Sequence, residues 1–413
     1  MARVWSRERA LLAASLAGGL ALRIAAIAAG GGYPFDIVTF QRWAERLGIG
    51  GPPSFYDPGQ FADYPPGFLY FLWPLGALPG VPPSWLLRAI STPFDLAIAL
   101  LIFAVVARLR SPRDGLIASA AYSLNPAVAL AGPFWGQVDA IALLPLLLSL
   151  VAYASGRYAI AGALAAIAAL VKPQAAIALG ILIITGAAMV AKRRDWRPLL
   201  ATGATAIVTT LVLWLPFAPT VDKLAAFLRD ATTPHPFSSL FAFNVWALAS
   251  GFAVSDDTTL AGVPIRVWGL LLVGLGLALV VARLVALVPS RDRPIVFDRH
   301  LAMLLAITAL AALAVYELPT RIHERYLVTV LPLLAPFVTV TRRASVAYVI
   351  FSIVLAVSIF FSFTHQDQTR VRAAELVERT LFDPSVIVLL ILAGLGAAAA
   401  LAIGWTRREP RLG

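Results

Sequence analysis

Long apolar stretches separated by short polar loops run through the whole chain, a pattern typical of a protein that crosses a membrane many times. A membrane-spanning helix needs about 20 predominantly apolar residues, and somewhat fewer where the bilayer thins. On this basis the sequence predicts about 12 transmembrane helices, within a range of about 11 to 14. The predicted spans lie near residues 11–30, 87–107, 115–131, 137–154, 158–171, 175–191, 199–217, 264–287, 299–317, 326–341, 345–362 and 383–405.

The composition favours an all-α polytopic membrane protein with a single transmembrane domain over residues 1–413. Hydrophobic residues make up 60% of the sequence and charged residues only 13%, whereas about 25% of residues are charged in ordinary soluble domains. No polar stretch is long enough for a second, soluble domain. The chain contains no cysteine, which excludes disulfides and cysteine-ligated metals.

The positive charges lie mainly in short loops between the apolar stretches. Examples are Lys192-Arg193-Arg194 and Arg342-Arg343, and the formal net charge is +11. Because cytoplasmic loops of membrane proteins are enriched in lysine and arginine, this placement predicts that both termini are cytoplasmic. It also explains the net charge without a nucleic-acid partner. The first span lacks a small-residue cleavage site, so we expect it to remain as an anchor.

This threading leaves two large extracytoplasmic loops, at residues 31–86 and 218–263. In the first loop, the segment Asp36–Leu47 has an apolar stripe at helical spacing, which predicts an amphipathic helix at the membrane interface. The apolar segment Phe68–Leu78 is too short to span a bilayer and predicts a half-span or interfacial helix. The stripe consists of Ile37, Phe40, Trp43, Ala44 and Leu47.

Most polar motifs of the chain fall on the extracytoplasmic side of this threading. Ionisable groups near hydrocarbon are costly, so groups that converge on one face favour a functional site. The motifs contain Asp36, Asp63, Tyr64, Gln137, Asp139, Lys172, Gln174, Asn244, Trp246, Arg321, His323, Glu324 and Arg325.

Two of the three aspartates of the first loop, Asp36 and Asp63, stand in motifs with a structural interpretation, and Asp36 also allows a functional one. Asp36 follows the first span, where it suits either the N-cap of a helix over 37–47 or a base that takes a proton from a sugar hydroxyl. Asp63-Tyr64 precedes two prolines, which fix a turn that returns the chain to the membrane.

Three further polar side chains lie where predicted spans begin or end. Gln137 and Asp139 open a span with an amide and an acid, which suits hydrogen bonds to sugar hydroxyls or between helices. The span 158–171 reaches only about 21 Å, so it leaves Lys172 below the outer surface of a hydrocarbon core about 30 Å thick. Its charge then needs an anionic partner, such as a lipid phosphate, unless the side chain snorkels upward.

The segment 321–326 places four ionisable groups at the start of a predicted span. Such a run usually lies in a solvated loop, but the apolar residues that follow hold this one at the membrane interface. Guanidinium groups match the geometry of phosphate oxygens, so Arg321, His323 and Arg325 suit a phosphate clamp.

The remaining signals narrow the substrate class. Asn244 and Trp246, in the second large loop, suit either an interfacial aromatic belt or contacts with a sugar ring. The sequence contains no Walker loop, no dinucleotide fingerprint, no His-Glu-x-x-His motif and no Gly-x-Ser-x-Gly motif. A nucleotide sugar is therefore not expected to be the direct donor.

The motifs, in their order along the chain, resemble those of GT-C fold glycosyltransferases that use polyprenyl-phosphate sugars. The order is an acid after the first span, an Asp-Tyr-Pro-Pro corner, a Gln-x-Asp span start, a Lys-Pro-Gln break and a His-Glu-Arg segment. The sequence is similar to bacterial relatives of the GPI mannosyltransferases and of the Alg glucosyltransferases of the lipid-linked oligosaccharide pathway. In the latter, Asp-Tyr-Pro-Pro and His-Glu-Lys motifs occupy corresponding places. The resemblance runs from about residue 20 to 340.

The resemblance implies a GT-C-like bundle and an inverting transfer of a hexose, most often mannose, from a polyprenyl-phosphate donor to an acceptor hydroxyl. It implies no nucleotide and no cofactor, and usually no required metal. Asp36 matches the position of the catalytic base, and Lys172, His323 and Arg325, together with Arg321, would hold the donor phosphate. Contacts to the sugar or the acceptor are expected from Asp63, Tyr64, Gln137, Asp139, Gln174, Glu324, Asn244 and Trp246.

Two other functions share much of this pattern. A transporter or flippase of a lipid-linked sugar would need the same lipid site but no base. An oligosaccharide polymerase or ligase would use an oligosaccharide-diphosphate donor. As a glycosyltransferase, the protein is expected in the bacterial cell (inner) membrane with its site on the extracytoplasmic face. The sequence leaves open whether the acceptor is a glycolipid, a lipoglycan or a protein, and whether glucose or arabinose replaces mannose.

Overall fold

About three-quarters of the chain is helical (75%), which confirms the predicted all-α polytopic class. The computed structural model describes residues 2–232, 235–366, 369, 371–407 and 409–412. Within these residues, eight helices are long and apolar enough to cross a membrane, some of them extended by a short neighbouring helix. They are built on α1 (Ala2–Ala28), α5 (Thr92–Leu109), α10 (Ala176–Arg193), α11 (Arg197–Trp214), α14 (Ile265–Leu287), α15 (Phe297–Glu317), α17 (Arg342–His365) and α19 (Pro384–Arg407).

The other predicted spans are also largely helical, but they are short or broken. In the described residues, only one bent pair adds to the eight long helices, so length and composition alone support up to nine crossings. The expected count of about 12 therefore stays a prediction. These shorter segments are α6 (Pro112–Ser123) with α7 (Pro126–Ala129) and the π-helical η2 (Leu130–Phe134), α8 (Asp139–Ala154), α9 (Tyr158–Val171), and η5 (Glu324–Thr329) with α16 (Val330–Leu334) and η6 (Ala335–Phe337).

The remaining elements are short connections or lie near one end of the bundle. The strands β1 and β2 form a single antiparallel two-stranded ladder. These elements are α2 (Pro34–Gly50), η1 (Pro52–Ser54), α3 (Pro66–Gly76), α4 (Ser84–Ala89), η3 (Pro173–Ala175), η4 (Leu215–Phe217), α12 (Val221–Thr232), α13 (Val245–Ser250), β1 (Thr259–Leu260), β2 (Val263–Pro264) and α18 (Glu375–Thr380).

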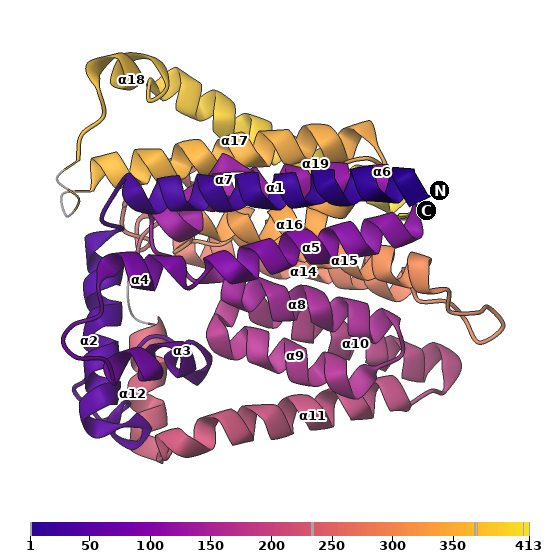
Figure 1. Cartoon of the computed structure of the whole chain (residues 1–413), viewed down its shortest axis with the longest axis horizontal. Coiled ribbons are helices and arrows are strands. Elements are labelled where there is room, and N and C mark those ends of the chain that lie inside the picture. Colours follow the sequence, from indigo (N-terminus) through magenta and orange to yellow (C-terminus); the bar gives the residue numbers. More distant parts are fainter. Residues whose placement is uncertain (1, 233–234, 367–368, 370, 408, 413) are drawn as a thin grey trace.

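The two ends of the helix bundle differ in construction (Figure 1). At one end, α2 and α12 run across the direction of the long helices, with α3 beside them, whereas both chain termini lie at the opposite end. The amphipathic helix predicted at Asp36–Leu47 is α2, and all five residues of its predicted apolar stripe are buried. The placement of both termini at one end fits the predicted threading.

Helix α3 is the predicted short apolar helix, and glycines let it pack closely on both sides. A Cβ atom at Gly76 would lie 2.0 Å from the carbonyl oxygen of Ala44 in α2. A Cβ atom at Gly67 would lie 2.5 Å from the carbonyl carbon of Leu170 in α9. Real side chains do not tolerate such distances, so α3 contacts the backbones of α2 and α9 directly. The start of α3 is thereby held next to the end of α9.

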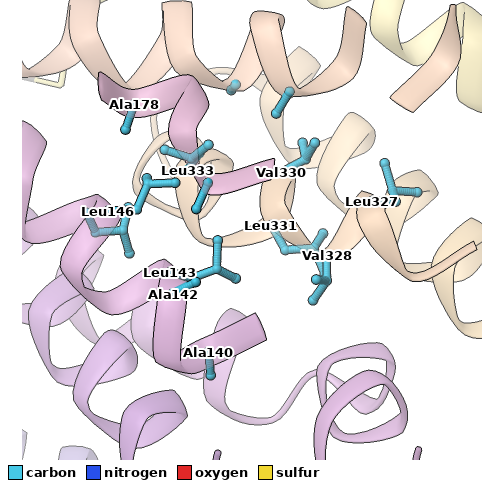
Figure 2. Packing of buried hydrophobic residues seen from close by; sticks show 14 of the residues in the cluster. Ala140, Ala142, Leu143, Leu146, Ala178, Leu327, Val328, Val330, Leu331 and Leu333 are labelled. Atoms are coloured by element: carbon cyan, nitrogen blue, oxygen red, sulfur yellow. The ribbon is translucent and has the colours of Figure 1, made fainter. Parts of the chain in front are cut away.

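A buried apolar cluster joins the middle of the chain to its last third. Figure 2 shows side chains from α8, α10, η5 and α16 gathered in this cluster, including Leu143, Leu146, Ala178 and Leu331. The polar residues at the start of α8 and the start of η5 are therefore carried by elements that pack on one another. Close packing of this kind fixes their relative positions.

A buried ion pair links three of the helices at the N-terminal part of the chain. Arg23 of α1 donates from Nε to Asp95 of α5 at 3.0 Å, and both side chains are almost fully buried. Tyr122 of α6 donates to the other carboxylate oxygen of Asp95 at 2.8 Å, and Arg23 also donates to the carbonyl oxygen of Ser123 at 2.6 Å. This network satisfies the charge of an arginine inside the predicted first span.

We expect Asp95→Asn to destabilise the fold, because it leaves the buried Arg23 charge without its partner. Removal of one partner of a buried pair costs about 3–5 kcal/mol, whereas the double change Arg23→Met with Asp95→Leu restores most of the loss. Thermal unfolding of the protein in detergent checks this. Glu375→Gln is the control, because its pair with Arg379 is about three-quarters exposed and contributes about 1 kcal/mol or less. Equal midpoints for Asp95→Asn and wild type would contradict the expectation.

Candidate functional site

Asp36 lies in the first turn of α2, at the end of the bundle that α2 crosses. Its carboxylate oxygen Oδ2 accepts hydrogen bonds from Trp135 Nε1 at 2.7 Å and from Gln137 Nε2. The alternative role of Asp36 as an N-cap is wrong, because α2 begins earlier, at Pro34, and Tyr33 precedes it without a side-chain cap. The side chain of Asp36 is thus directed toward the loop before α8 and remains partly exposed.

Gln137 connects Asp36 to a lysine through opposite ends of one amide group. Its nitrogen donates to Asp36, and its oxygen accepts from Lys172 Nζ at 2.7 Å and from the Tyr64 hydroxyl at 3.3 Å. Lys172 Nζ also donates to Asp139 Oδ1 at 2.9 Å. The structure therefore brings together five residues that the sequence placed in four separate motifs. We call this set the polar network: Asp36, Tyr64, Gln137, Lys172 and Asp139.

The position of Lys172 follows from the length of α9. This helix has 14 residues, as predicted, and ends at Val171, so Lys172 starts an extended segment before η3 while still inside the protein. The residue is only 2% exposed, so its side chain does not snorkel to the surface. Burial lowers the pKa of Lys172, and the charge of Asp139 acts in the opposite direction. Gln174 adds a longer hydrogen bond to Asp139, at 3.4 Å.

Arg325, at the start of η5, lies near Trp135, which donates to Asp36 of the polar network. Its guanidinium carbon lies 5.7 Å from the ring centre of Trp135, and Nη1 donates to Glu324 at 3.2 Å. Burial by itself lowers the pKa of Arg325, but the Asp36 and Glu324 carboxylates outweigh burial and raise that pKa above its usual value. The buried Nε has no hydrogen-bond acceptor among the described residues.

His323 is held beside Arg325 by the second large loop. The backbone of Leu240 donates to Ile322 at 2.9 Å, and Arg325 Nη1 lies 3.3 Å from Nδ1 of His323. Burial and the positive charge of Arg325 lower the pKa of His323 well below its usual value, so the imidazole is neutral at pH 7. It therefore acts as a hydrogen-bonding group and not as a third cation.

Asp63 lies in the loop just before α3 and is partly exposed. Burial of its carboxyl group, with a smaller contribution from the charge of Asp36, raises the pKa of Asp63 to about 7. A carboxyl group with this pKa is protonated in a large fraction of molecules at neutral pH. It can then donate a hydrogen bond as well as accept one.

Three of the predicted site residues have side chains that bond to residues not predicted for the site. Arg321 pairs instead with the buried Asp256 at 2.7 Å. Asn244 caps α13, and its amide nitrogen donates to the carbonyl oxygen of Tyr316 at 3.2 Å. Trp246 donates its single N–H to the carbonyl oxygen of Leu318 at 2.7 Å and is 2% exposed. Both Asn244 and Trp246 hold the second loop onto α15 instead of facing a ligand.

Two aromatic residues of the site were not among the predicted contacts. Trp135 donates to Asp36, and its ring stacks on Tyr33 with ring centres 4.5 Å apart. The Tyr33 hydroxyl donates to the side-chain oxygen of Gln366. Trp135 immediately precedes Gly136-Gln137, so its position next to the Gln-x-Asp motif could have indicated that it belongs to the site. Tyr33 and Gln366 carried no such signal, because their partners are distant in sequence.

The described residues contain no group of three or more His, Asp or Glu side chains arranged to hold a metal ion. The chemistry available at this end of the bundle is that of a carboxylate, a buried guanidinium and a set of hydrogen-bonding groups. A carboxylate beside a cation can accept a proton while the cation stabilises a leaving anion.

The chain was compared with known proteins. No curated protein matches it. The structure of the oligosaccharyltransferase of Archaeoglobus fulgidus in the apo form is similar at 14% sequence identity and a TM-score of 0.43. That alignment covers 98% of this chain and 56% of the archaeal chain, so this chain spans about half the length of that protein.

The sequence profile of glycosyltransferase family 87 matches residues 61–315, which is more than half of the chain. The matched region includes four of the five residues of the polar network and lacks only Asp36. The predicted class of protein is confirmed at the level of the family: the chain belongs to glycosyltransferase family 87.

Proposed function

We propose that this protein transfers a hexose, with mannose as the first candidate, from a polyprenyl-phosphate monosaccharide to an acceptor hydroxyl with inversion at the anomeric carbon. The acceptor is a glycolipid, a lipoglycan or a protein. Transfer takes place at the end of the bundle crossed by α2. The placement of lysine and arginine supports an extracytoplasmic location of this end, in a bacterial inner membrane as proposed.

One observation carries the proposal: the two carboxylate oxygens of Asp36 are used differently. Trp135 and Gln137 both donate to Oδ2, which fixes the orientation of the group. In the described part of the chain, Oδ1 accepts no hydrogen bond. A carboxylate oriented through one oxygen and open at the other is suited to act as a general base.

The reaction that this geometry supports is a direct displacement. Oδ1 of Asp36 takes the proton of the acceptor hydroxyl as its oxygen forms a bond to the anomeric carbon of the donor. The bond between that carbon and the phosphate oxygen breaks on the opposite face. The polyprenyl phosphate leaves with the electron pair, and the proton stays on Asp36 until it is released to water.

Arg325 is the residue best suited to the donor phosphate. Among the described residues its buried Nε has no acceptor, the guanidinium lies over the Trp135 ring, and the charge of Asp36 raises its pKa. A phosphate oxygen would complete its hydrogen bonding and would gain negative charge as the bond breaks. His323, as a neutral donor beside Arg325, would add a second contact, while Arg321 is already paired with Asp256.

Lys172 has a different part in this proposal from the phosphate contact expected of it. Its ammonium group donates to Gln137 and Asp139, so it directs the amide nitrogen of Gln137 at Asp36. Lys172 is thus a positioning residue for the base. The partly exposed groups nearby, Asp63, Tyr64 and Gln174, are the proposed sugar contacts, since hydroxyl groups need both donors and acceptors.

We expect Asp36→Asn to lower kcat by about 10²–10⁴, because the amide keeps an oxygen for Trp135 and Gln137 but cannot take a proton. The measurement is transfer of labelled mannose from polyprenyl-phosphate mannose by purified protein. Asp57→Asn is the control, since Asp57 is about half exposed and pairs with Lys223 away from the network. Transfer by Asp36→Asn at the wild-type rate would exclude Asp36 as the base. If the wild-type protein used only an oligosaccharide-diphosphate donor, the proposed reaction itself would be rejected.

Arg325→Lys keeps the positive charge beside Glu324 but removes Nε and the planar fork. We expect kcat/KM for the donor to fall by at least about tenfold, because ammonium cannot make the paired contacts of guanidinium to phosphate. Arg266→Lys is the matched control, since Arg266 is about half exposed and pairs with an exposed aspartate. If both variants kept the wild-type kcat/KM, Arg325 would not contact the donor phosphate.

Asp63 predicts a pH dependence of stability. Its pKa is raised in the folded protein from 3.8 to about 7, so its neutral form stabilises the fold fully below pH 3.8, and this contribution is lost as pH rises through 7. Asp63→Asn removes the titration. The thermal midpoint of the variant relative to wild type should therefore be higher at pH 8 than at pH 5, and a pH-independent difference would contradict the raised pKa.

A further inference from the structure

A polar cavity lies at the end of the bundle that holds both termini, opposite to the polar network. Its volume is about 760 Å³. It lies between the start of α17 and the end of α19, and the residues after α19 complete its wall. We call it the terminal pocket. Its charged side chains are Arg342, Arg343, Arg407, Glu409 and Arg411.

The charge of the terminal pocket is strongly unbalanced. Four arginines face one glutamate, and in the described part of the chain none of the four guanidinium groups forms an ion pair. This differs from the candidate functional site, where Lys172 and Arg325 each have a carboxylate partner. Guanidinium groups gathered without counter-charges repel each other, and an anion that bridges them removes the repulsion. The backbone N–H groups at the start of α17 add the favourable end of a helix dipole.

The wall of the pocket is fixed in place by contacts of its own. Leu412 and Pro410 are buried, and Arg110 donates to the carbonyl oxygen of Leu412 at 3.3 Å. The side chain of Arg343 lies over Gly404, where a Cβ atom would stand 3.1 Å from Nη1. Residues 409–412 are thus packed against the bundle, and Arg343 reaches across to α19.

The inner side of the pocket is apolar. Phe337 and Trp405 pack together with ring centres 5.2 Å apart, and Val340 and Leu401 continue this surface. Next to it, Ile403 of α19 is about half exposed on the outside of the bundle, where lipid chains are expected. A rim of arginines above an apolar floor beside the lipid-facing surface fits a molecule with a phosphate head and a hydrocarbon chain. A small anion would not use the apolar part.

We propose that the terminal pocket binds the headgroup of an anionic phospholipid, with the phosphate among the arginines and the chain along α19. The positive-inside pattern assigns this end to the cytoplasmic leaflet, where basic pockets between transmembrane helices recognise anionic headgroups. This site is separate from the proposed donor site at the other end of the bundle. Its occupant is a structural lipid and not the substrate.

The test compares lipid binding by purified full-length protein and two variants with the same change in net charge. The first variant is Arg343→Gln, Arg407→Gln and Arg411→Gln; the control is Arg291→Gln, Arg293→Gln and Arg299→Gln, all exposed and at the α14–α15 connection. The probes are phosphatidylglycerol, phosphatidylcholine and inorganic phosphate. Binding is measured by native mass spectrometry and by the rise of the thermal midpoint with each probe.

We expect phosphatidylglycerol to bind wild type and the control variant, and to bind the pocket variant at least about tenfold more weakly. Phosphatidylcholine and inorganic phosphate should bind all three proteins more weakly than phosphatidylglycerol binds wild type. Equal binding of phosphatidylglycerol to the pocket and control variants would overturn the proposal. So would displacement of the lipid by inorganic phosphate at equal concentration, which would indicate a site for the free ion. Equal thermal midpoints of the two variants without lipid show that both are folded.

Discussion

The buried positive charge of Lys172 is the constraint on which the geometry of the site depends. Helix α9 is too short to carry this residue to a membrane surface, so the charge has to be compensated within the protein. Asp139 supplies the counter-charge, and Gln137 supplies a second acceptor. The side-chain oxygen of Gln137 accepts from Lys172, which fixes the orientation of the amide. The nitrogen of the same amide then points to Asp36 and donates to it. One buried ammonium group thus orders three elements around the proposed base.

Each buried cation of the site has a carboxylate partner before any ligand arrives. Lys172 pairs with Asp139 and Arg325 with Glu324, so neither cation waits as an isolated charge. Such pairing avoids the large cost of an uncompensated charge in a low-dielectric region. The pairing still leaves hydrogen-bond donors for a donor phosphate, chiefly Nε of Arg325, which has no acceptor among the described residues. The site would thus recognise the phosphate by geometry as much as by net charge.

The sequence predicted the parts of this arrangement that depend on local pattern. The apolar stripe of α2, the length of α9 and the all-helical class follow from periodicity and span length, and all three are observed. What it could not reveal depends on contacts between distant segments. Asp256 as the partner of Arg321, and the carbonyl groups that bind Asn244 and Trp246, lie in other elements. The start of α2 was misjudged locally, because Pro34 fits the first turn of a helix as well as Asp36 fits a cap.

The orientation of Trp135 depends on the number of residues in the π-helical turn η2, and not only on side-chain contacts. The amide of Trp135 donates to the carbonyl oxygen of Leu130, five residues earlier, at 3.0 Å. An α-helix would close this turn one residue sooner, and each residue of an α-helix turns about 100°. Removal of a single residue between Ala129 and Trp135 would thus rotate the indole away from Asp36 by roughly a quarter turn. The one additional residue in this turn therefore sets the direction of the indole, and with it the hydrogen bond from Trp135 that holds the Asp36 carboxylate.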